Sequence, residues 1–343
     1  MGGAAVTRLA GLTHRDASWA GLRVVVAGLG VSGFAAADAL LERGARVTVL
    51  DAGSRHPAPA RVQRERATVL EMLGADVRLG PEHVEALPAD LAAPAATDLV
   101  VTSPGWRPDQ PVLAGAAERG LPIWGEVELA WRMRPAEGAA PWLTVTGTNG
   151  KTTTVRLLAG MLTAAGLRAT AAGNVGTPIL EAVLHPQPYD AIAVELSSFQ
   201  LHYSASLAPL ASACLNLAPD HLDWHGSLAA YRDAKAKVYA RTQVACVYNA
   251  QDQVTEQMVR RAEVQEGCRA VGFTLGVPGL SEVGLVEDVL ADRAFVEERT
   301  TSAAELGTLA DLRPEGAPAD SPVPPHLVAN ALAAAALARA AGA

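Results

Sequence analysis

Short apolar runs alternate with segments of helical spacing through the first part of the chain. The apolar runs lie at residues 22–27, 46–51, 99–102 and 122–124, and apolar positions recur with helical spacing from 34 to 43. Strands separated by helices of this size are typical of β-α-β units. The pattern therefore predicts a parallel sheet in the N-terminal part of the chain.

A second alternation of the same kind follows a segment rich in proline and glycine. Between residues 272 and 325 the pattern weakens to short strand-like pieces. We predict an N-terminal domain at 1–134, a linker at 135–141 and a second domain at 142–343. The second domain is predicted to contain strands at 142–146, 191–195, 211–215 and 244–248, a helix from Lys151, a helix at 231–239 and a closing helix at 328–340.

The closing helix is almost entirely alanine and leucine, and the chain stops soon after it at Ala343. A helix that is apolar all round must be covered by protein on every side. Such a helix would normally lead onward, so we expect the sequence to be a fragment of a longer protein.

The composition is that of a folded protein with more than one domain. The chain has 343 residues and a mass of 35.5 kDa, with 50% hydrophobic and 19% charged residues, which excludes a disordered polyelectrolyte. A net charge of −8 argues against nucleic acid as a partner. Three cysteines form no C-x-x-C pair, and no basic–apolar leader is present. We expect a cytoplasmic protein that does not associate with membranes.

Lysine is scarce, because only Lys151, Lys235 and Lys237 stand among the 28 basic residues. Where arginine supplies ordinary positive charge, the few lysines are candidates for chemistry that a guanidinium cannot perform. Residues two apart on a helix point about 200° from each other. At most one of Lys235 and Lys237 is therefore expected to point into a site.

The first glycine motif, Gly28-Leu29-Gly30-Val31-Ser32-Gly33, matches G-x-G-x-x-G after a predicted strand and before a predicted helix. Glycines at these positions permit a tight turn and close approach of a phosphate to the backbone at a helix N-terminus. Asp51 ends the next predicted strand, where a carboxylate can accept hydrogen bonds from a nucleoside. Taken alone, this motif occurs most often in nicotinamide-dependent dehydrogenases.

The second motif points to a nucleoside triphosphate. It follows the strand at 142–146 and opens a helix, so its backbone amides can surround phosphates while Lys151 bridges the β and γ phosphates and Thr152 holds Mg²⁺. Val145 stands where the general P-loop pattern has glycine. A γ-phosphate clamp argues against a simple dehydrogenase. The candidate ATP-binding residues are Gly147, Thr148, Asn149, Gly150, Lys151, Thr152 and Thr153.

Acidic and histidine residues at predicted strand ends suggest metal chemistry. Glu195 ends an apolar strand, and hard cations such as Mg²⁺ prefer oxygen ligands. His221 shares its turn with Asp220 and Asp223 after another strand, which raises its candidacy as a ligand.

The order of these motifs resembles the Mur ligases of peptidoglycan synthesis, most closely those that add D-glutamate to UDP-N-acetylmuramoyl-L-alanine. The resemblance runs from about residue 22 to the end of the chain. It rests on Gly28–Gly33, Ser103-Pro104-Gly105, Thr146–Thr153, Gly173-Asn174-Val175-Gly176, Glu195–Leu201, Asp220–Asp223 and Tyr231–Lys235 in that order.

The resemblance implies a fold class and a reaction. It implies an α/β protein with an N-terminal Rossmann-like parallel-sheet domain and a P-loop-type α/β ATPase domain, while the family's C-terminal third domain is absent. The activity would be an ATP-dependent, ADP-forming ligation of an acid to a D-amino acid through an acyl phosphate, carried out by a monomer. Without the third domain, we expect this chain to bind the nucleotide sugar but to turn over poorly.

Ligand roles follow from the resemblance position by position. Lys151 would clamp ATP, and Asn330 would approach the adenine. Thr152 and Glu195 would hold one Mg²⁺, while His221 and Lys235 would hold the second, with Lys235 converted to a carbamate by CO₂. The catalytic residues would be Lys151, His221 and Lys235. The UDP-sugar would be bound by Gly30, Val31, Ser32, Gly33, Asp51, Ser103, Pro104, Gly105, Asn174, Ser197, Gln200 and His221.

The chain departs from the family pattern in two places. Ala52 and Gly53 stand where relatives often carry polar side chains for uridine, and Pro325-His326-Leu327 stands where a His-Asn pair is common. Three alternatives stay open: a sibling ligase for another amino acid, an NAD(P)-dependent oxidoreductase, and a non-catalytic nucleotide-sugar sensor.

Overall fold

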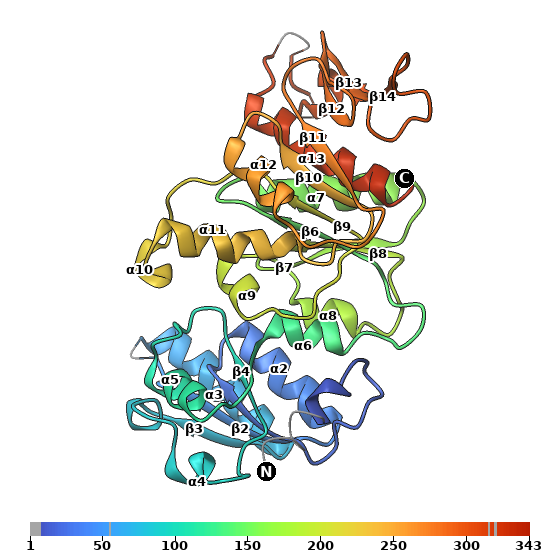
Figure 1. Cartoon of the computed structure of the whole chain (residues 1–343). Coiled ribbons are helices and arrows are strands. Elements are labelled where there is room, and N and C mark those ends of the chain that lie inside the picture. The colour runs from blue at the N-terminus through green and yellow to red at the C-terminus, as the bar shows by residue number, and fades with distance from the viewer. Residues whose placement is uncertain (1–7, 55, 315, 319–320) are drawn as a thin grey trace. The chain divides into compact units, whose positions relative to one another are not determined.

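The computed structural model describes residues 8–54, 56–314, 316–318 and 321–343, and they form two compact units (Figure 1). Unit 1 comprises Met1–Ala139 together with Pro178–Pro188 and Tyr203–Ser206, and unit 2 comprises the remaining residues. In both units, parallel strands alternate with helices along the chain. The predicted α/β fold class is therefore confirmed.

Unit 1 is built on a five-stranded parallel sheet in the order β3-β2-β1-β4-β5. The strands β1, β4 and the inner part of β2 are almost wholly buried aliphatic residues, as expected for a sheet covered on both faces. The elements are β1 (Arg23–Ala27), α2 (Val31–Glu42), β2 (Arg46–Asp51), α3 (Pro57–Met72), β3 (Asp76–Leu79), η1 (Pro81–His83), α4 (Ala89–Ala92), β4 (Leu99–Thr102), α5 (Pro111–Glu118), β5 (Ile123–Gly125), α6 (Glu126–Arg132) and α8 (Ile179–Val183).

Two buried carboxylates hold the later segments of unit 1 in place. Glu128 accepts hydrogen bonds from the backbone of Ala205 and Ser206 at 2.8 and 2.9 Å and from Arg132 at 2.7 Å. Burial opposes ionisation, but these hydrogen bonds outweigh it and lower the pKa of Glu128. Glu126 accepts from the Leu180 amide at 3.4 Å, and burial raises its pKa.

Unit 2 contains a nine-stranded sheet in the order β14-β13-β12-β11-β10-β9-β6-β8-β7. Pairing is parallel from β7 to β12 and antiparallel from β12 to β14. The elements are β6 (Trp142–Thr146), α7 (Lys151–Ala164), β7 (Ala169–Gly173), β8 (Ala191–Glu195), α9 (Ser198–His202), β9 (Ala211–Cys214), α10 (Leu222–His225), α11 (Leu228–Ala236), η2 (Lys237–Tyr239), β10 (Ala245–Asn249), α12 (Gln253–Arg260), β11 (Arg269–Phe273), β12 (Glu282–Val286), β13 (Val289–Asp292), β14 (Ala304–Thr308), η3 (Leu309–Leu312) and α13 (Pro325–Ala340).

The closing helix α13 lies alongside α7 on the sheet of unit 2 (Figure 1). Its residues from Ala331 to Ala338 are all buried, and they join the core formed by Leu143, Leu158 and Val271. The predicted burial of this helix is thus confirmed, because the core of unit 2 covers it. In the part of the chain that the structure describes, no helix is long and apolar enough to cross a membrane.

Several predicted elements agree with the structure to the residue, and others needed correction. The strands at 46–51, 99–102, 142–146 and 191–195 have the predicted bounds. The first helix begins at Val31 rather than residue 34, and the helix predicted at 231–239 begins earlier and ends as η2. β3, α3 and β7 were not predicted, because β3 is only partly buried, α3 is mostly exposed and β7 is largely alanine.

Candidate functional site

Each glycine of the first motif meets a different steric demand. Gly28 has φ +101°, and a Cβ there would lie 2.7 Å from Ser103 Oγ and 2.8 Å from Trp106 Nε1. A Cβ at Gly33 would lie 1.9 Å from the Gly28 carbonyl oxygen, whereas a Cβ at Gly30 would meet no atom within 4 Å. Gly28 and Gly33 therefore let the loop pack closely against its neighbouring atoms. Gly30 instead leaves the backbone uncovered on the side from which a phosphate could approach.

Asp51 holds this glycine loop from the end of β2. Its Oδ2 accepts from the Leu29 amide at 2.6 Å, and its Oδ1 accepts from the Gly53 amide at 2.8 Å and from Gln63 Nε2 at 3.2 Å. The carboxylate thus fixes the loop after β1 and the turn after β2 together. Its predicted contact with a nucleoside remains a prediction.

The other predicted nucleotide-sugar residues of unit 1 surround the same loop. Val31 and Ser32 form the first turn of α2, with the Val31 side chain 55% exposed. The Ser32 hydroxyl bonds to the buried Glu126. Ser103 lies after β4 with its Oγ 3.4 Å from the Gly28 carbonyl oxygen, and Pro104 and Gly105 continue that turn.

Trp106 is a candidate that the sequence did not single out. It follows Ser103-Pro104-Gly105, and its indole N–H lies against Gly28 without a hydrogen-bond partner among the residues described. An indole N–H is only a donor. In the sequence, the one signal for Trp106 as a candidate is its position after the turn that follows the strand at 99–102.

In the P-loop of unit 2, the lysine side chain bonds the backbone of its own loop. Lys151 Nζ donates to the carbonyl oxygens of Gly147 and Thr148 at 2.9 and 3.0 Å. Burial lowers the pKa of Lys151, and the nearby Glu195 carboxylate partly opposes that shift. Its predicted bridging of the β and γ phosphates of ATP remains a prediction.

Residues from the neighbouring loop brace the P-loop. Asn216 Oδ1 accepts from the Asn149 amide at 2.9 Å, and Asn216 Nδ2 donates to the Asn149 carbonyl at 3.1 Å. The Thr148 hydroxyl lies 3.1 Å from Tyr231 Oη. Asn216 and Tyr231 were not predicted as site residues, although Tyr231 opens the Tyr231–Lys235 string that contributes to the family resemblance.

Asn330 reaches the P-loop from α13. It is 6% exposed, and a Cβ at Gly150 (φ +87°) would lie 2.4 Å from its Oδ1. The structure thus places the Asn330 side chain against the loop; its predicted approach to adenine is untested. Thr153 lies exposed in the first turn of α7.

Glu195 and Thr152 form an oxygen-rich corner at the end of β8. Thr152 Oγ1 donates to Glu195 Oε2 at 2.8 Å, and Asn174 Nδ2 donates to Glu195 Oε1 at 3.0 Å. Glu195 is 1% exposed. A hydroxyl and a carboxylate are suitable ligands for Mg²⁺ beside phosphates. No group of three or more His, Cys, Asp or Glu residues able to hold a metal alone occurs in the described residues.

Lys235 lies buried behind the P-loop. It is 2% exposed, and Nζ donates to the Gly147 carbonyl at 2.9 Å while lying 4.8 Å from the Tyr231 ring centroid. Burial lowers the pKa of Lys235 to about 8. Lys237 is instead exposed, which confirms that at most one of the two lysines points inward.

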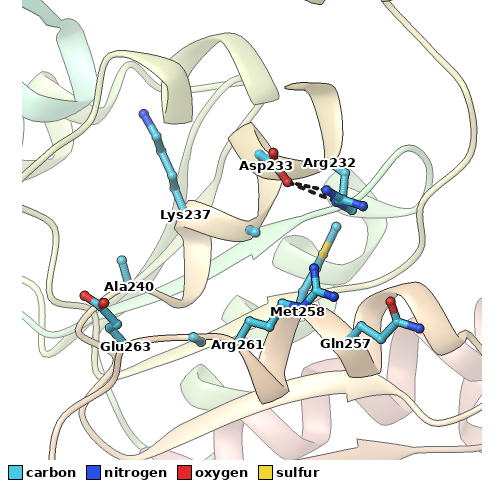
Figure 2. A pocket seen from close by; sticks show the side chains of 10 residues that line it. Arg232, Asp233, Lys237, Ala240, Gln257, Met258, Arg261 and Glu263 are labelled. Atoms are coloured by element: carbon cyan, nitrogen blue, oxygen red, sulfur yellow. Dashed lines mark hydrogen bonds and ion pairs between the residues drawn. The ribbon is translucent and has the colours of Figure 1, made fainter. Parts of the chain in front are cut away.

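Lys237 lines a separate cavity of about 300 Å³ between α11 and α12. Figure 2 shows Lys237, Met258 and Arg261 around this hollow. The cavity contains none of the predicted site residues. It is therefore not the candidate active site.

Three further predicted residues lie in or next to α9 and α10: Gln200 is in α9, while Ser197 and His221 immediately precede α9 and α10. Gln200 Oε1 accepts from the Ser197 amide and hydroxyl at 2.9 and 3.1 Å. His221 adopts a left-handed conformation (φ +49°), and its Nε2 lies 3.4 Å from Asp220 Oδ2. The His221 ring stacks obliquely on Phe199, with ring centroids 4.8 Å apart.

Comparison with known families matches both parts of the chain. Residues 145–338 match the Mur ligase middle domain, and residues 22–125 match the MurD-like N-terminal domain of Mur ligases. The chain belongs to the Mur ligase family. This membership accounts for the two glycine motifs in one chain, which a simple oxidoreductase does not.

Curated relatives are similar over nearly the whole chain. The chain is 55% identical to the UDP-N-acetylmuramoylalanine–D-glutamate ligase of Streptomyces avermitilis over 325 residues, covering 95% of this chain and 65% of the relative. It is 50% identical to the enzyme of that name from Leifsonia xyli, covering 98% of this chain and 64% of the relative. The chain thus spans about two thirds of the length of these relatives.

A solved structure supports the fold independently. The UDP-N-acetylmuramate:L-alanyl-gamma-D-glutamyl-meso-diaminopimelate ligase from Neisseria meningitides superimposes with a TM-score of 0.54 at 20% identity, covering 94% of this chain and 95% of that structure. At this identity the likeness concerns the fold alone.

Substitution of two glycines tests the assignment of the first loop. Gly33→Ala should lower the free energy of unfolding by about 2 kcal/mol or more, because the backbone carbonyl of Gly28 blocks the new methyl group and outweighs a helix-propensity gain of about 1 kcal/mol. Gly30→Ala, at φ −74° in open space, should stay within about 0.5 kcal/mol. Urea unfolding measures both; equal losses would contradict the assigned packing.

Proposed function

We propose that this chain binds UDP-N-acetylmuramoyl-L-alanine and ATP and acts in joining D-glutamate to the nucleotide sugar. The observation that carries the proposal is the 50–55% identity to ligases of that name across both motif-bearing units. The P-loop next to a buried carboxylate at Glu195 supports an ATP-dependent reaction. The reaction would release ADP and phosphate.

The reaction proceeds in two displacements. The terminal carboxylate oxygen of the nucleotide sugar attacks the γ-phosphorus of ATP; that O–P bond forms as the bond to ADP breaks. The D-glutamate nitrogen then attacks the acyl carbon, loses a proton, and phosphate leaves with its C–O electron pair. Phosphoryl transfer of this kind depends mainly on positioning and charge.

Lys151 would supply positive charge at the transferred group. Its ammonium now rests on two P-loop carbonyl oxygens, and phosphate oxygens of ATP would draw it away from them. The brace from Asn216 and Tyr231 keeps the loop backbone in place during that exchange. Asn330 would hold Gly150 from the other side.

Two Mg²⁺ ions would neutralise the phosphate oxygens when bound. Thr152 and Glu195 fit the first ion, since their oxygens already meet at 2.8 Å. His221 and carbamylated Lys235 would hold the second. Asn174 orients Glu195 by its hydrogen bond to Oε1.

Carbamylation of Lys235 would resolve an electrostatic problem. A buried ammonium without a carboxylate partner is unfavourable, and burial brings the pKa of Lys235 to about 8. With this pKa about a tenth of the amine is neutral at pH 7, and that fraction can attack CO₂, forming an N–C bond and releasing a proton. The product is an anion that a cation can bind.

The nucleotide sugar would contact the first glycine motif and four residues that lie outside both motifs. Its diphosphate would lie at Gly30, Val31 and Ser32, where a helix N-terminus and an open glycine favour an anion. The sugar and lactyl-alanine end would reach Asn174, Ser197, Gln200 and His221.

The amino-acid requirement tests this function. Phosphate release should be assayed with full-length protein. It should depend on UDP-N-acetylmuramoyl-L-alanine and D-glutamate together. L-alanine, glycine or a diamino acid should not replace D-glutamate; preference for one of these would favour a sibling ligase instead.

Lys235 and Lys237 provide a matched pair for the carbamate. Lys235→Arg keeps the charge but cannot form the carbamate, so ligation should fall by about 10²-fold or more, while Lys237→Ala should retain activity. The measurements are phosphate release and the ¹³C carbamate resonance in ¹³C-bicarbonate. Full activity of Lys235→Arg would remove Lys235 from the reaction.

Two threonines of α7 test the metal corner. Thr152→Val should weaken Mg²⁺-dependent ATP binding about tenfold or more, because it deletes a metal ligand beside Glu195. Thr163→Val removes an exposed hydroxyl that bonds only its own helix and should change nothing. Isothermal titration with MgATP measures both, and equal affinities would contradict the assigned ligand.

A further inference from the structure

Two of the three cysteines of the chain lie side by side where β10 pairs with β11 in unit 2. Cys246 lies in β10 and Cys268 immediately precedes β11, and their Sγ atoms are 3.8 Å apart. Cys246 is in register with Ala270, and Cys268 stands two residues before Ala270. Alternate residues of a strand project to the same face of a sheet. The pairing of the two strands therefore brings the thiols together across 22 positions of the chain.

A row of buried hydroxyl groups holds the Cys246 thiol from the other side. Thr144 Oγ1 donates to Ser212 Oγ at 2.8 Å, and Ser212 Oγ lies 2.9 Å from Thr242 Oγ1. Thr242 in turn hydrogen-bonds the Cys246 thiol. Because β9 and β11 flank β10 on opposite sides, this row fixes Cys246 from the side of β9 and leaves Cys268 as its neighbour on the side of β11.

The two thiols differ in access and in acidity. Cys246 is 2% exposed, whereas Cys268 is partly exposed. The hydrogen bond from the Cys246 thiol lowers the pKa of Cys268, and the same hydrogen bond together with burial raises the pKa of Cys246. In thiol–disulfide exchange the thiolate is the nucleophile, and its rate of attack depends on access. Cys268 therefore fits the role of attacking thiol, and Cys246 fits the role of the thiol that resolves the product.

The backbone around Cys268 permits a bond between the two sulfur atoms. A disulfide bond is about 2.0 Å long, so the Sγ atoms must approach each other by about 1.8 Å. Cys268 belongs to a turn in which its amide donates to the Gln265 carbonyl at 3.1 Å, and the pairing with β10 begins after it, at Arg269. Side-chain rotation and a small shift of this turn can therefore close the distance without breaking the sheet.

We propose that Cys246 and Cys268 form a reversible disulfide, which cross-links the two ends of the segment that contains α12. The Cys268 thiolate attacks one sulfur of a low-molecular-weight disulfide, so that a mixed disulfide forms and one small thiolate leaves. Cys246 then loses its proton and attacks Cys268 Sγ, and the second small thiolate leaves. The two protein thiols are oxidised, the small disulfide is reduced, and the protons pass to the released thiolates. This modification does not depend on the proposed ligase function.

The cross-linked segment supports the loop that braces the P-loop. Two of its side chains bond the backbone on either side of Asn216: Asn249 Nδ2 donates to the Leu215 carbonyl at 3.4 Å, and Asp252 Oδ2 accepts from the Leu217 amide at 3.2 Å. A disulfide restricts the unfolded chain and so favours the folded state. Because the native strand pairing already brings the thiols together, oxidation should stabilise this segment rather than deform it.

Peptide mapping after oxidation tests the proposal, because trypsin separates the three cysteines into peptides 169–232, 242–260 and 262–269. The chain is incubated with oxidised glutathione, unfolded, and alkylated with iodoacetamide before digestion. Mass spectrometry should find peptides 242–260 and 262–269 joined with the loss of two hydrogen atoms, and peptide 169–232 alkylated. Dithiothreitol should reverse the link. The oxidised chain should show a thermal midpoint raised by roughly 5 °C or more.

Two single variants supply the controls. Cys268→Ser removes the attacking thiol from a partly exposed turn, so it should fold normally, form no link and lose the rise in thermal midpoint. Cys214→Ala removes the third thiol and should cross-link as the unmodified chain does. Glutathione that stays on Cys268, a link to peptide 169–232, or two alkylated thiols at 246 and 268 would each overturn the disulfide. A link that leaves the midpoint unchanged or lowers it would overturn the stabilising role.

Discussion

A buried positive charge behind the P-loop is the interaction on which the candidate active site depends. Lys235 is enclosed by β6, α11 and the loop backbone, and its one short hydrogen bond goes to the Gly147 carbonyl. A charge in such surroundings must be paired, neutralised or chemically changed. The same carbonyl also accepts from Lys151, so two lysine side chains share one acceptor.

Carboxylates at strand ends organise both phosphate-binding motifs in the same way. Asp51 at the end of β2 fixes the backbone of the first glycine loop. Glu195 at the end of β8 accepts a hydrogen bond from Thr152 and so fixes the first turn of α7, the helix that the second glycine loop opens. In each case the carboxylate is satisfied by protein groups. The loops are therefore ordered before any ligand binds, which reduces the conformational entropy that binding must overcome.

The sequence predicted what depends on local pattern and missed what depends on distant neighbours. Buried strands such as 99–102 and 191–195 are predicted by continuous runs of apolar residues, and the glycine motifs are recognised from their spacing alone. The brace formed by Asn216 and the contact of Trp106 with Gly28 arise only when separate elements meet. The strands β13 and β14 lie in the stretch 272–325, where the sequence predicted short strand-like pieces but, because the alternation is weak, gave no bounds for them.

The composition of unit 1 has a consequence for how this architecture can be divided. Its fold is completed by residues that follow the P-loop in the chain, and without Ala205 and Ser206 the buried Glu128 would lose both amide donors to its Oε2 and keep only its ion pair with Arg132. A polypeptide cut at residue 139 would thus retain the sheet but lose the partners of its internal acids. Recombination between relatives at that boundary would instead keep these donors, because they are backbone amides that the second parent also supplies.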